Sequence, residues 1–158
     1  MPKIKTVLIA LLFASISLIV GTFYFFGLTV NLTESMPLGL YQFSQGNTDI
    51  TKSDLIVFNI HQTSDQLLKK VIGVENDHVV VNQEGVFLNG ALVANSKIFR
   101  FDSKGHPLTP KLLDKILVKN EIFAMGDHIQ SYDSRYFGTV YVKENNIRKV
   151  HLLFTWSN

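Results

Sequence analysis

A serine and two lysines of this sequence could together supply a nucleophile and its base. Ser35 stands in the stretch 33–37 (TESMP), and Lys69 and Lys70 stand side by side in the apolar run 67–74 (LLKKVIGV). A serine hydroxyl is a weak nucleophile until a neighbour accepts its proton. A lysine amine can accept it only when neutral, so its pKa must fall from about 10.4, and burial among apolar groups is the usual cause.

The run 67–74 predicts a strand, in which the two lysines face opposite sides. Each lysine would then share its face with apolar neighbours, so alternation alone does not identify the base. Pro37 biases the residue before it towards extended backbone. The stretch that carries Ser35 is therefore expected to lead rigidly into the next predicted strand.

A polar stretch at 126–138 (GDHIQSYDSRYFG) could provide a scaffold for such a site. It also allows a rival interpretation, in which His128 is the base of a Ser-His-Asp triad with Asp127 or Asp133. The chain has no Gly-x-Ser-x-Gly elbow, and adjacency in sequence says little about triad geometry. Its five histidines are scattered without the spacing of a zinc site.

Composition limits the other classes of function. A chain of 158 residues allows one domain, all 13 acidic residues lie at or beyond Glu34, and the formal net charge is +2. The part beyond residue 28 is formally neutral, which argues against nucleic acid as a partner. The absence of cysteine excludes disulfides, thiolate catalysis and Cys-ligated zinc.

Residues 6–28 contain no charge and are almost wholly apolar. A helix of about 22 residues reaches about 33 Å, enough to cross the hydrocarbon core, so this segment is expected to be a transmembrane anchor. A cleavable leader ending near 15–17 (SIS) is the alternative, although the apolar run continues past it. Lys3 and Lys5 predict a cytoplasmic N-terminus at 1–5 and an extracytoplasmic domain at 29–158.

Short runs of β-branched and aromatic residues dominate the remainder and predict a mainly β domain, a distorted barrel or packed sheets. The expected strands are 40–44, 54–60, 66–74, 78–82, 86–88, 121–125, 139–142 and 151–156. Short helical turns are expected near 110–113 and 143–147, and an irregular excursion at 96–110.

The three strings, in this order behind one anchor, resemble the type I signal peptidases, peptidase family S26. Those serine-lysine enzymes remove leader peptides from exported proteins. Gly39 and Tyr41 after the serine, and the stretch 132–138 (YDSRYFG), are more similar to the conjugative-transfer, TraF-type branch, whose members process pilin precursors. The resemblance implies the signal-peptidase fold, which self-cleaving LexA-like repressors share.

The resemblance also assigns roles. Ser35 is the implied nucleophile and Lys69 the implied base, because the family lysine is followed by a basic residue, two more residues and a glycine. Thr33 and the Ser35 amide are implied to form the oxyanion hole. The supporting residues are then Ser131, which would orient the amine, an Asp133–Arg135 ion pair, and Asp127. The chain departs from the family at 75–77 (END, usually Pro-Gly-Asp) and at His128, usually Asn.

The expected function is therefore that of a membrane-anchored serine endopeptidase that acts on membrane-bound precursors, with hydrolysis or cyclisation of a pilin precursor as product. The expected location is the bacterial inner membrane with a periplasmic domain, and the expected partners are the precursor and the bilayer. No metal or organic cofactor is expected. The segment 38–44 is expected to bind substrate along its strand edge. A non-enzymatic β domain of a secretion or conjugation apparatus, and a self-cleaving repressor-type protease, are the alternatives.

Overall fold

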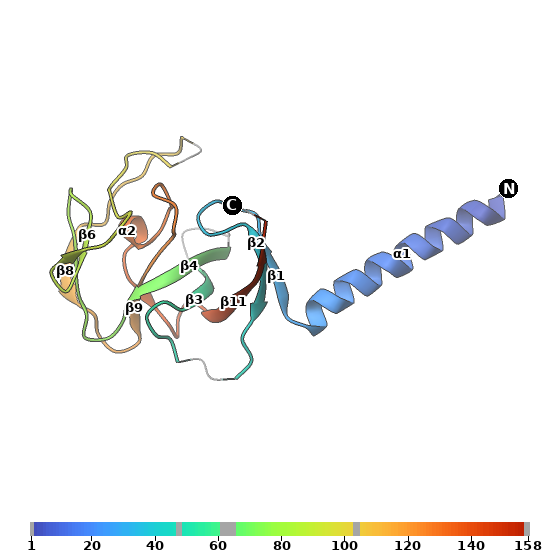
Figure 1. Ribbon diagram of the computed structural model, residues 1–158, viewed down its shortest axis with the longest axis horizontal. Helices are drawn as coiled ribbons and strands as arrows, with labels where there is room; N and C mark the ends of the chain where they lie inside the picture. Colours follow the sequence, from blue (N-terminus) through green and yellow to red (C-terminus); the bar gives the residue numbers. More distant parts are fainter. Residues whose placement is uncertain (1, 47–48, 61–65, 103–104, 157–158) are drawn as a thin grey trace.

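A computed structural model of the chain describes residues 2–46, 49–60, 66–102 and 105–156, and its architecture is mainly β, as predicted (Figure 1). One long helix precedes two antiparallel sheets. The strands are β1 (Leu28–Asn31), β2 (Gly39–Phe43), β3 (Leu55–Asn59), β4 (Gln66–Gly73), β5 (His78–Val81), β6 (Val86–Leu88), β7 (Ala91–Leu92), β8 (Leu113–Ile116), β9 (Glu121–Met125), β10 (Val140–Tyr141) and β11 (Arg148–Thr155). A short helix, α2 (Ser134–Phe137), lies between β9 and β10.

Helix α1 (Pro2–Phe25) projects away from the β domain (Figure 1). Its segment Ile4–Phe25 is long and apolar enough to cross a membrane, and its most apolar part is not buried against the domain. The helix stops before Gly27, whose φ of +59° is a left-handed conformation suited to glycine. The predicted anchor, 6–28, thus extends past the end of the helix, because Leu28 already begins strand β1.

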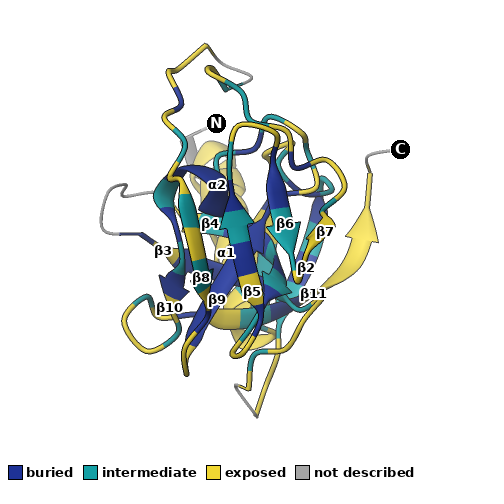
Figure 2. Ribbon diagram, turned by 90° about the vertical axis from the view of Figure 1, so that its left-hand side faces the viewer, coloured by how far each residue is buried: buried dark blue, intermediate teal, exposed yellow. Residues whose placement is uncertain are grey.

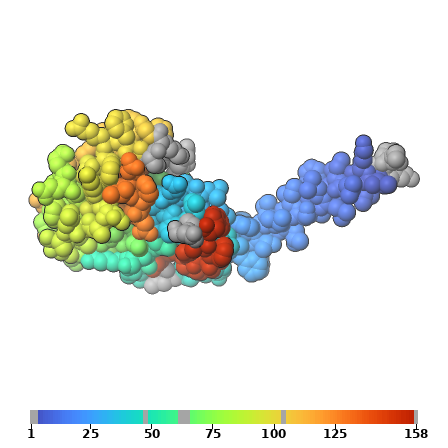
Figure 3. All heavy atoms as spheres, turned by 45° about the horizontal axis from the view of Figure 1, so that its top comes forward, coloured from blue at the N-terminus to red at the C-terminus, as the bar shows by residue number. Residues whose placement is uncertain are grey.

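The larger sheet has seven strands in the order β1-β2-β11-β3-β4-β9-β10. Strand β2 lies between the first strand of the chain, β1, and the last, β11, and pairs with both. The final residues of β11 are exposed (Figure 2). They lie near the base of α1 (Figure 3). The smaller sheet has the order β7-β6-β5-β8.

Three apolar clusters hold the sheets together. The first contains Ile56, Phe58 and Val71 with residues of β9 and β10, and the second lies under the smaller sheet around Val79 and Phe123. The third joins Met36, Tyr41, Val57, Leu68 and Val150, and so packs the chain around Ser35 against β2, β3, β4 and β11.

The strands predicted at 86–88 and 121–125 have the bounds expected, and those predicted at 66–74 and 78–82 end one residue earlier. Those predicted at 40–44 and 54–60 differ by one residue at each end. The predicted strand 139–142 is shortened to β10, and the predicted 151–156 begins three residues earlier, at Arg148. The helical turns expected near 110–113 and 143–147 are wrong: β8 begins at Leu113, and 142–146 form non-helical turns. The excursion at 96–110 is largely irregular, apart from residues 103–104, which lie outside the described residues.

The prediction that segment 38–44 offers a free edge to substrate is also wrong. Strand β2 lies between β1 and β11, and its register pairs Tyr41 with Thr29 on one side and with Leu152 on the other. Both rows of backbone hydrogen-bonding groups are therefore occupied. The adjacent strand β1 is the edge of the sheet in the described part of the chain.

Candidate active site

Ser35 lies in the loop 32–38 between β1 and β2, and the Asn31–Gly39 pair closes that loop. Met36 anchors it, with 3% of its surface exposed, in the apolar cluster next to Tyr41. The Tyr41 hydroxyl donates a hydrogen bond of 2.8 Å to the Pro37 carbonyl. These contacts fix the backbone on the C-terminal side of Ser35, whose own side chain is half-buried.

Thr33 stands beside Ser35 at the outer side of the loop. The two hydroxyl oxygens are 3.3 Å apart, and Thr33 is exposed. The Thr33 hydroxyl also donates a hydrogen bond of 2.8 Å to Oδ1 of Asn31. Asn31 is a buried residue that sequence reasoning missed, and its other contacts also lie within this loop.

Lys69 is buried in strand β4, with 2% of its surface exposed, opposite Ile56 of β3. Its amine donates a hydrogen bond of 2.9 Å to the Ser131 hydroxyl, which is also buried. Burial disfavours the ammonium form and lowers the pKa of Lys69 from 10.5 to about 8; the negative charge of Asp133 opposes this shift and Arg135 adds to it. The amine is therefore held in the environment that a neutral lysine requires.

Gly126 brings the segments of Ser35 and Ser131 together. A side-chain carbon at this position would lie 2.2 Å from Ser131 Oγ and 2.7 Å from the Ser35 carbonyl oxygen, so only glycine fits. Those two oxygens can be no farther apart than the sum of these distances. The His128 amide also donates a hydrogen bond of 3.3 Å to the Ser35 carbonyl. The loop of Ser35 thus rests directly on the chain segment that holds the lysine amine.

In the part of the chain that the structure describes, no hydrogen bond joins the Ser35 hydroxyl to the Lys69 amine. Ser35 Oγ contacts Thr33 and Lys69 Nζ contacts Ser131. Catalytic hydrogen bonds often tighten only when substrate is bound. The structure therefore brings the two groups to one place in the fold without showing them as a bonded pair.

Asp133 and Arg135 form a fully buried ion pair that ties the site together. Two nitrogens of the guanidinium donate to the two carboxylate oxygens, both at 2.8 Å, and Asp133 also accepts from the Gly126 amide at 3.1 Å. Arg135 also donates to the backbone carbonyls of Ser131, Ile129 and Lys97. Because every charged group is paired, the pair can hold the Ser131 loop rigidly.

Asp127 and His128 lie at the rim of this site. Asp127 forms an exposed salt bridge of 3.3 Å with Lys70. The His128 ring accepts a hydrogen bond from the Gln130 amide through Nδ1, and the Asp133 carboxylate is engaged by Arg135. No aspartate orients the His128 ring among the described residues, so the geometry does not favour a Ser-His-Asp triad.

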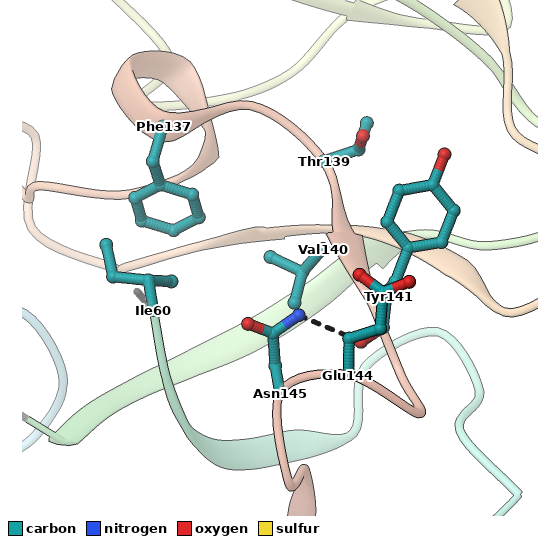
Figure 4. A pocket seen from close by; sticks show the side chains of 7 residues that line it. All are labelled: Ile60, Phe137, Thr139, Val140, Tyr141, Glu144 and Asn145. Atoms are coloured by element: carbon teal, nitrogen blue, oxygen red, sulfur yellow. Dashed lines mark hydrogen bonds between the residues drawn. The ribbon is translucent and has the colours of Figure 1, made fainter. Parts of the chain in front are cut away.

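Two hollows accompany these elements. One, of about 260 Å³, lies next to the site between β1, β2, β3, β4 and the start of the Ser35 loop. It is lined by Thr29, Val30, Asn31, Leu32, Thr33, Tyr41, Val57, Gln66 and Leu68. The other, of about 180 Å³, lies near β10 and contains none of the predicted site residues. Figure 4 shows Phe137 with Ile60 at one side of this second hollow and Tyr141 with Glu144 at the other.

The chain is similar to known signal peptidases and to plasmid transfer proteins. A family model described as signal peptidase, peptidase S26, matches residues 2–156. A plasmid transfer protein TraF of Escherichia coli is 29% identical, in an alignment that covers 88% of this chain and 89% of the relative. A probable conjugal transfer protein TraF of Sinorhizobium fredii is 28% identical and covers 74% of this chain and 72% of the relative. A crystal structure of a signal peptidase I from Enterococcus faecalis is similar with a TM-score of 0.42 and 21% identity, covering 69% of this chain and 100% of its own.

Proposed function

The chain belongs to the signal peptidase family, peptidase S26, and from that premise we propose that it is a membrane-anchored serine endopeptidase that cleaves leader peptides from membrane-bound precursors. The observation that carries the proposal is the Lys69 amine, which is buried, hydrogen-bonded to Ser131 and has a pKa lowered to about 8. A lysine whose pKa is lowered towards neutral pH, and which lies beside a loop that carries a serine, suits general-base catalysis.

In the proposed mechanism, neutral Lys69 takes the proton of the Ser35 hydroxyl as Ser35 Oγ attacks the scissile carbonyl carbon. For this the Ser35 side chain turns from Thr33 towards the amine. The Thr33 hydroxyl and the Ser35 amide donate hydrogen bonds to the oxyanion. Protonated Lys69 then gives its proton to the leaving amine. Neutral Lys69 next takes a proton from the water that attacks the acyl-enzyme, and returns it to Ser35 Oγ as the ester bond breaks. Ser131 orients the amine throughout.

The substrate is proposed to bind as an extended strand along the free edge of β1. Strand β1 leads directly into the loop of Ser35, and the hollow of about 260 Å³ lies against it. Strand addition would supply backbone hydrogen bonds, and the apolar lining from Val30, Val57 and Leu68 would receive a substrate side chain.

The plasmid and conjugal transfer relatives favour a role in conjugation. The resemblance to the TraF-type branch implies that the precursor is a pilin, which we propose is processed by hydrolysis or by cyclisation. Helix α1 is proposed to cross the bacterial inner membrane once. Lys3 and Lys5 favour a cytoplasmic N-terminus at 1–5, with residues 6–28 as anchor and the domain 29–158 in the periplasm.

The test is mass spectrometry of a pilin precursor co-expressed with the full chain. Ser35→Ala and Lys69→Met are expected to abolish the mature product. Ser44→Ala, an exposed serine just beyond β2, and Lys70→Met, the adjacent lysine, are the matched controls and are expected to leave processing intact. Undiminished processing by the Ser35 variant would refute the peptidase proposal and favour a non-enzymatic domain of a conjugation apparatus.

A further inference from the structure

Asn31, the last residue of β1, lies inside the loop that carries Ser35. Only 7% of its surface is exposed, although it is polar. Backbone pairing with Gly39 fixes its position at the point where the two strands separate. Its carboxamide points into the loop 32–38, towards the backbone carbonyls of that loop.

The amide nitrogen of Asn31 holds the loop from within. It donates to three carbonyl oxygens of the loop: Thr33 at 2.9 Å, and Met36 and Pro37 at 3.0 Å each. A carboxamide has two N–H groups, so one of them is shared between carbonyls. These bonds tie the backbone on both sides of Ser35 to one fixed side chain.

The oxygen of Asn31 determines how the neighbouring hydroxyls are arranged. It accepts from the Thr33 amide at 3.1 Å and from the Thr33 hydroxyl at 2.8 Å. A carboxamide oxygen cannot donate, so the single hydroxyl proton of Thr33 points at Asn31. In the 3.3 Å contact between the two hydroxyls, Ser35 is therefore the donor and Thr33 the acceptor.

We propose that Asn31 is a positioning residue for the reaction: its carboxamide holds the backbone of Ser35 against the Gly126 segment and sets the place from which the Thr33 hydroxyl serves the oxyanion. This inference rests on the proposed peptidase function. On substrate binding the Thr33 proton turns from Asn31 to the oxyanion, while the bond from the Thr33 amide keeps the residue in place. Asparagine suits the position, because alanine would leave the loop without these bonds and aspartate would oppose a carboxylate to three carbonyls.

The experiment is a double-mutant cycle on the full chain in detergent, with cleavage of the pilin precursor as the assay. Asn31→Ala is expected to lower kcat about 100-fold with little change in KM, because a displacement of about 1 Å is that costly. Thr33→Val, which keeps the shape of the side chain, is expected to lower kcat about 100-fold in the wild-type background. In the Asn31→Ala background, Thr33→Val is expected to cost less than about threefold, because the hydroxyl is no longer positioned.

Asn82→Ala is the matched control. The Asn82 side chain also holds a turn through its oxygen, which accepts from the backbone amides of Glu84 and Gly85, but this turn joins β5 and β6 of the smaller sheet. In that background Thr33→Val is expected to keep its full effect. If Asn31→Ala does not fold, as judged by circular dichroism, Asn31→Asp replaces it: it is the same size and keeps the oxygen that accepts from Thr33, but it opposes a carboxylate oxygen to the three carbonyls, so it is also expected to lower kcat.

A second readout separates positioning from general loss of structure. The pH at which the rate is half-maximal is expected to stay at the wild-type value in the Asn31 variants, because Lys69 makes its hydrogen bond to Ser131 and not to Asn31. Two results would overturn the inference: a wild-type kcat in the Asn31 variants, or additive effects of Asn31→Ala and Thr33→Val. If Ser35→Ala is inactive in the same assay, the peptidase function stands even though the inference has failed. Activity in Ser35→Ala would instead overturn the peptidase function on which it depends.

Discussion

Replacement of Lys69 by methionine should abolish cleavage and yet make the folded protein more stable at neutral pH. Methionine has a similar length and no charge, so it can occupy the same buried space in β4. What it removes is an amine that is almost completely buried and whose charged form is disfavoured there. Stability and activity should therefore change in opposite directions at this position.

The expected gain follows from the pKa. A fall from 10.5 to about 8 corresponds to about 3 kcal/mol of destabilisation by the buried ammonium group when both folded and unfolded states are protonated. Against this, the Ser131 hydroxyl loses its hydrogen-bond partner at a cost of about 1 kcal/mol. Lys69→Met should thus be about 2 kcal/mol more stable than wild type below pH 8.

A lysine that gains an acidic partner on folding has a raised pKa and loses its stabilising effect as the pH rises; the lowered pKa of Lys69 has the opposite effect on stability. Between pH 8 and 10.5 the folded protein has lost the Lys69 proton while the unfolded chain still binds it, so wild-type stability should rise with pH in this interval. Urea unfolding of the full chain in detergent, followed by Trp156 fluorescence at pH 7 and pH 10, measures the difference. The advantage of the variant should disappear at the higher pH.

Lys70→Met is the control, because Lys70 is half-exposed and pairs with Asp127 at the surface. Its stability should stay within about 1 kcal/mol of wild type at both pH values. If Lys69→Met were no more stable than wild type at pH 7, or if its advantage persisted unchanged to pH 10, the ammonium form would not be the disfavoured one and the argument for a neutral base would fail.

Other predictions concern the same site. The rate of precursor cleavage should rise through a pH of about 8 as Lys69 loses its proton, and a rate independent of pH between 6 and 9 would contradict this. Asp133→Asn should lower the free energy of unfolding by about 3–5 kcal/mol, because Arg135 would remain buried without its counterion, whereas Asp127→Asn should cost less than about 1 kcal/mol in the same urea titration. Gly126→Ala should abolish cleavage, because its methyl group would occupy the space between the Ser35 carbonyl and the Ser131 hydroxyl that holds the lysine amine; normal kcat in the folded variant would refute the close approach.

Much of the fold could be predicted because its strands are short, apolar and separated by clear turn residues. Strands β6 and β9 are examples: Gly85 precedes the first, and Asn120, at a φ of +64°, precedes the second. The burial of Lys69 was also foreseeable as a possibility, since Leu67 and Val71 share its face of β4 and pack with the first apolar cluster. The choice of Lys69 over Lys70 as the expected base came from the family resemblance.

Other features depend on contacts between distant residues, and local sequence does not encode them. Strand β1 follows an apolar helix directly, so its residues look like a continuation of the anchor until their pairing with β2 is known. The position of β2 inside the sheet depends on β11, more than 100 residues later. Asn31 has no motif of its own: a buried asparagine that holds a loop looks the same in sequence as one exposed to solvent. Helix α2 is different, because the sequence carries a local signal for it: Asp133 caps its N-terminus and Gly138 follows its last residue.

The connection between α1 and β1 consists of only Phe26 and Gly27, and the Gln42 side chain further ties the Phe26 carbonyl to β2. With α1 embedded in a bilayer, so short a joint leaves the domain little freedom to swing. Enzyme and precursor would then meet by lateral diffusion in a plane. Turnover in vesicles should accordingly follow the number of precursors per unit of lipid area, and dilution of the vesicles in buffer should leave it unchanged.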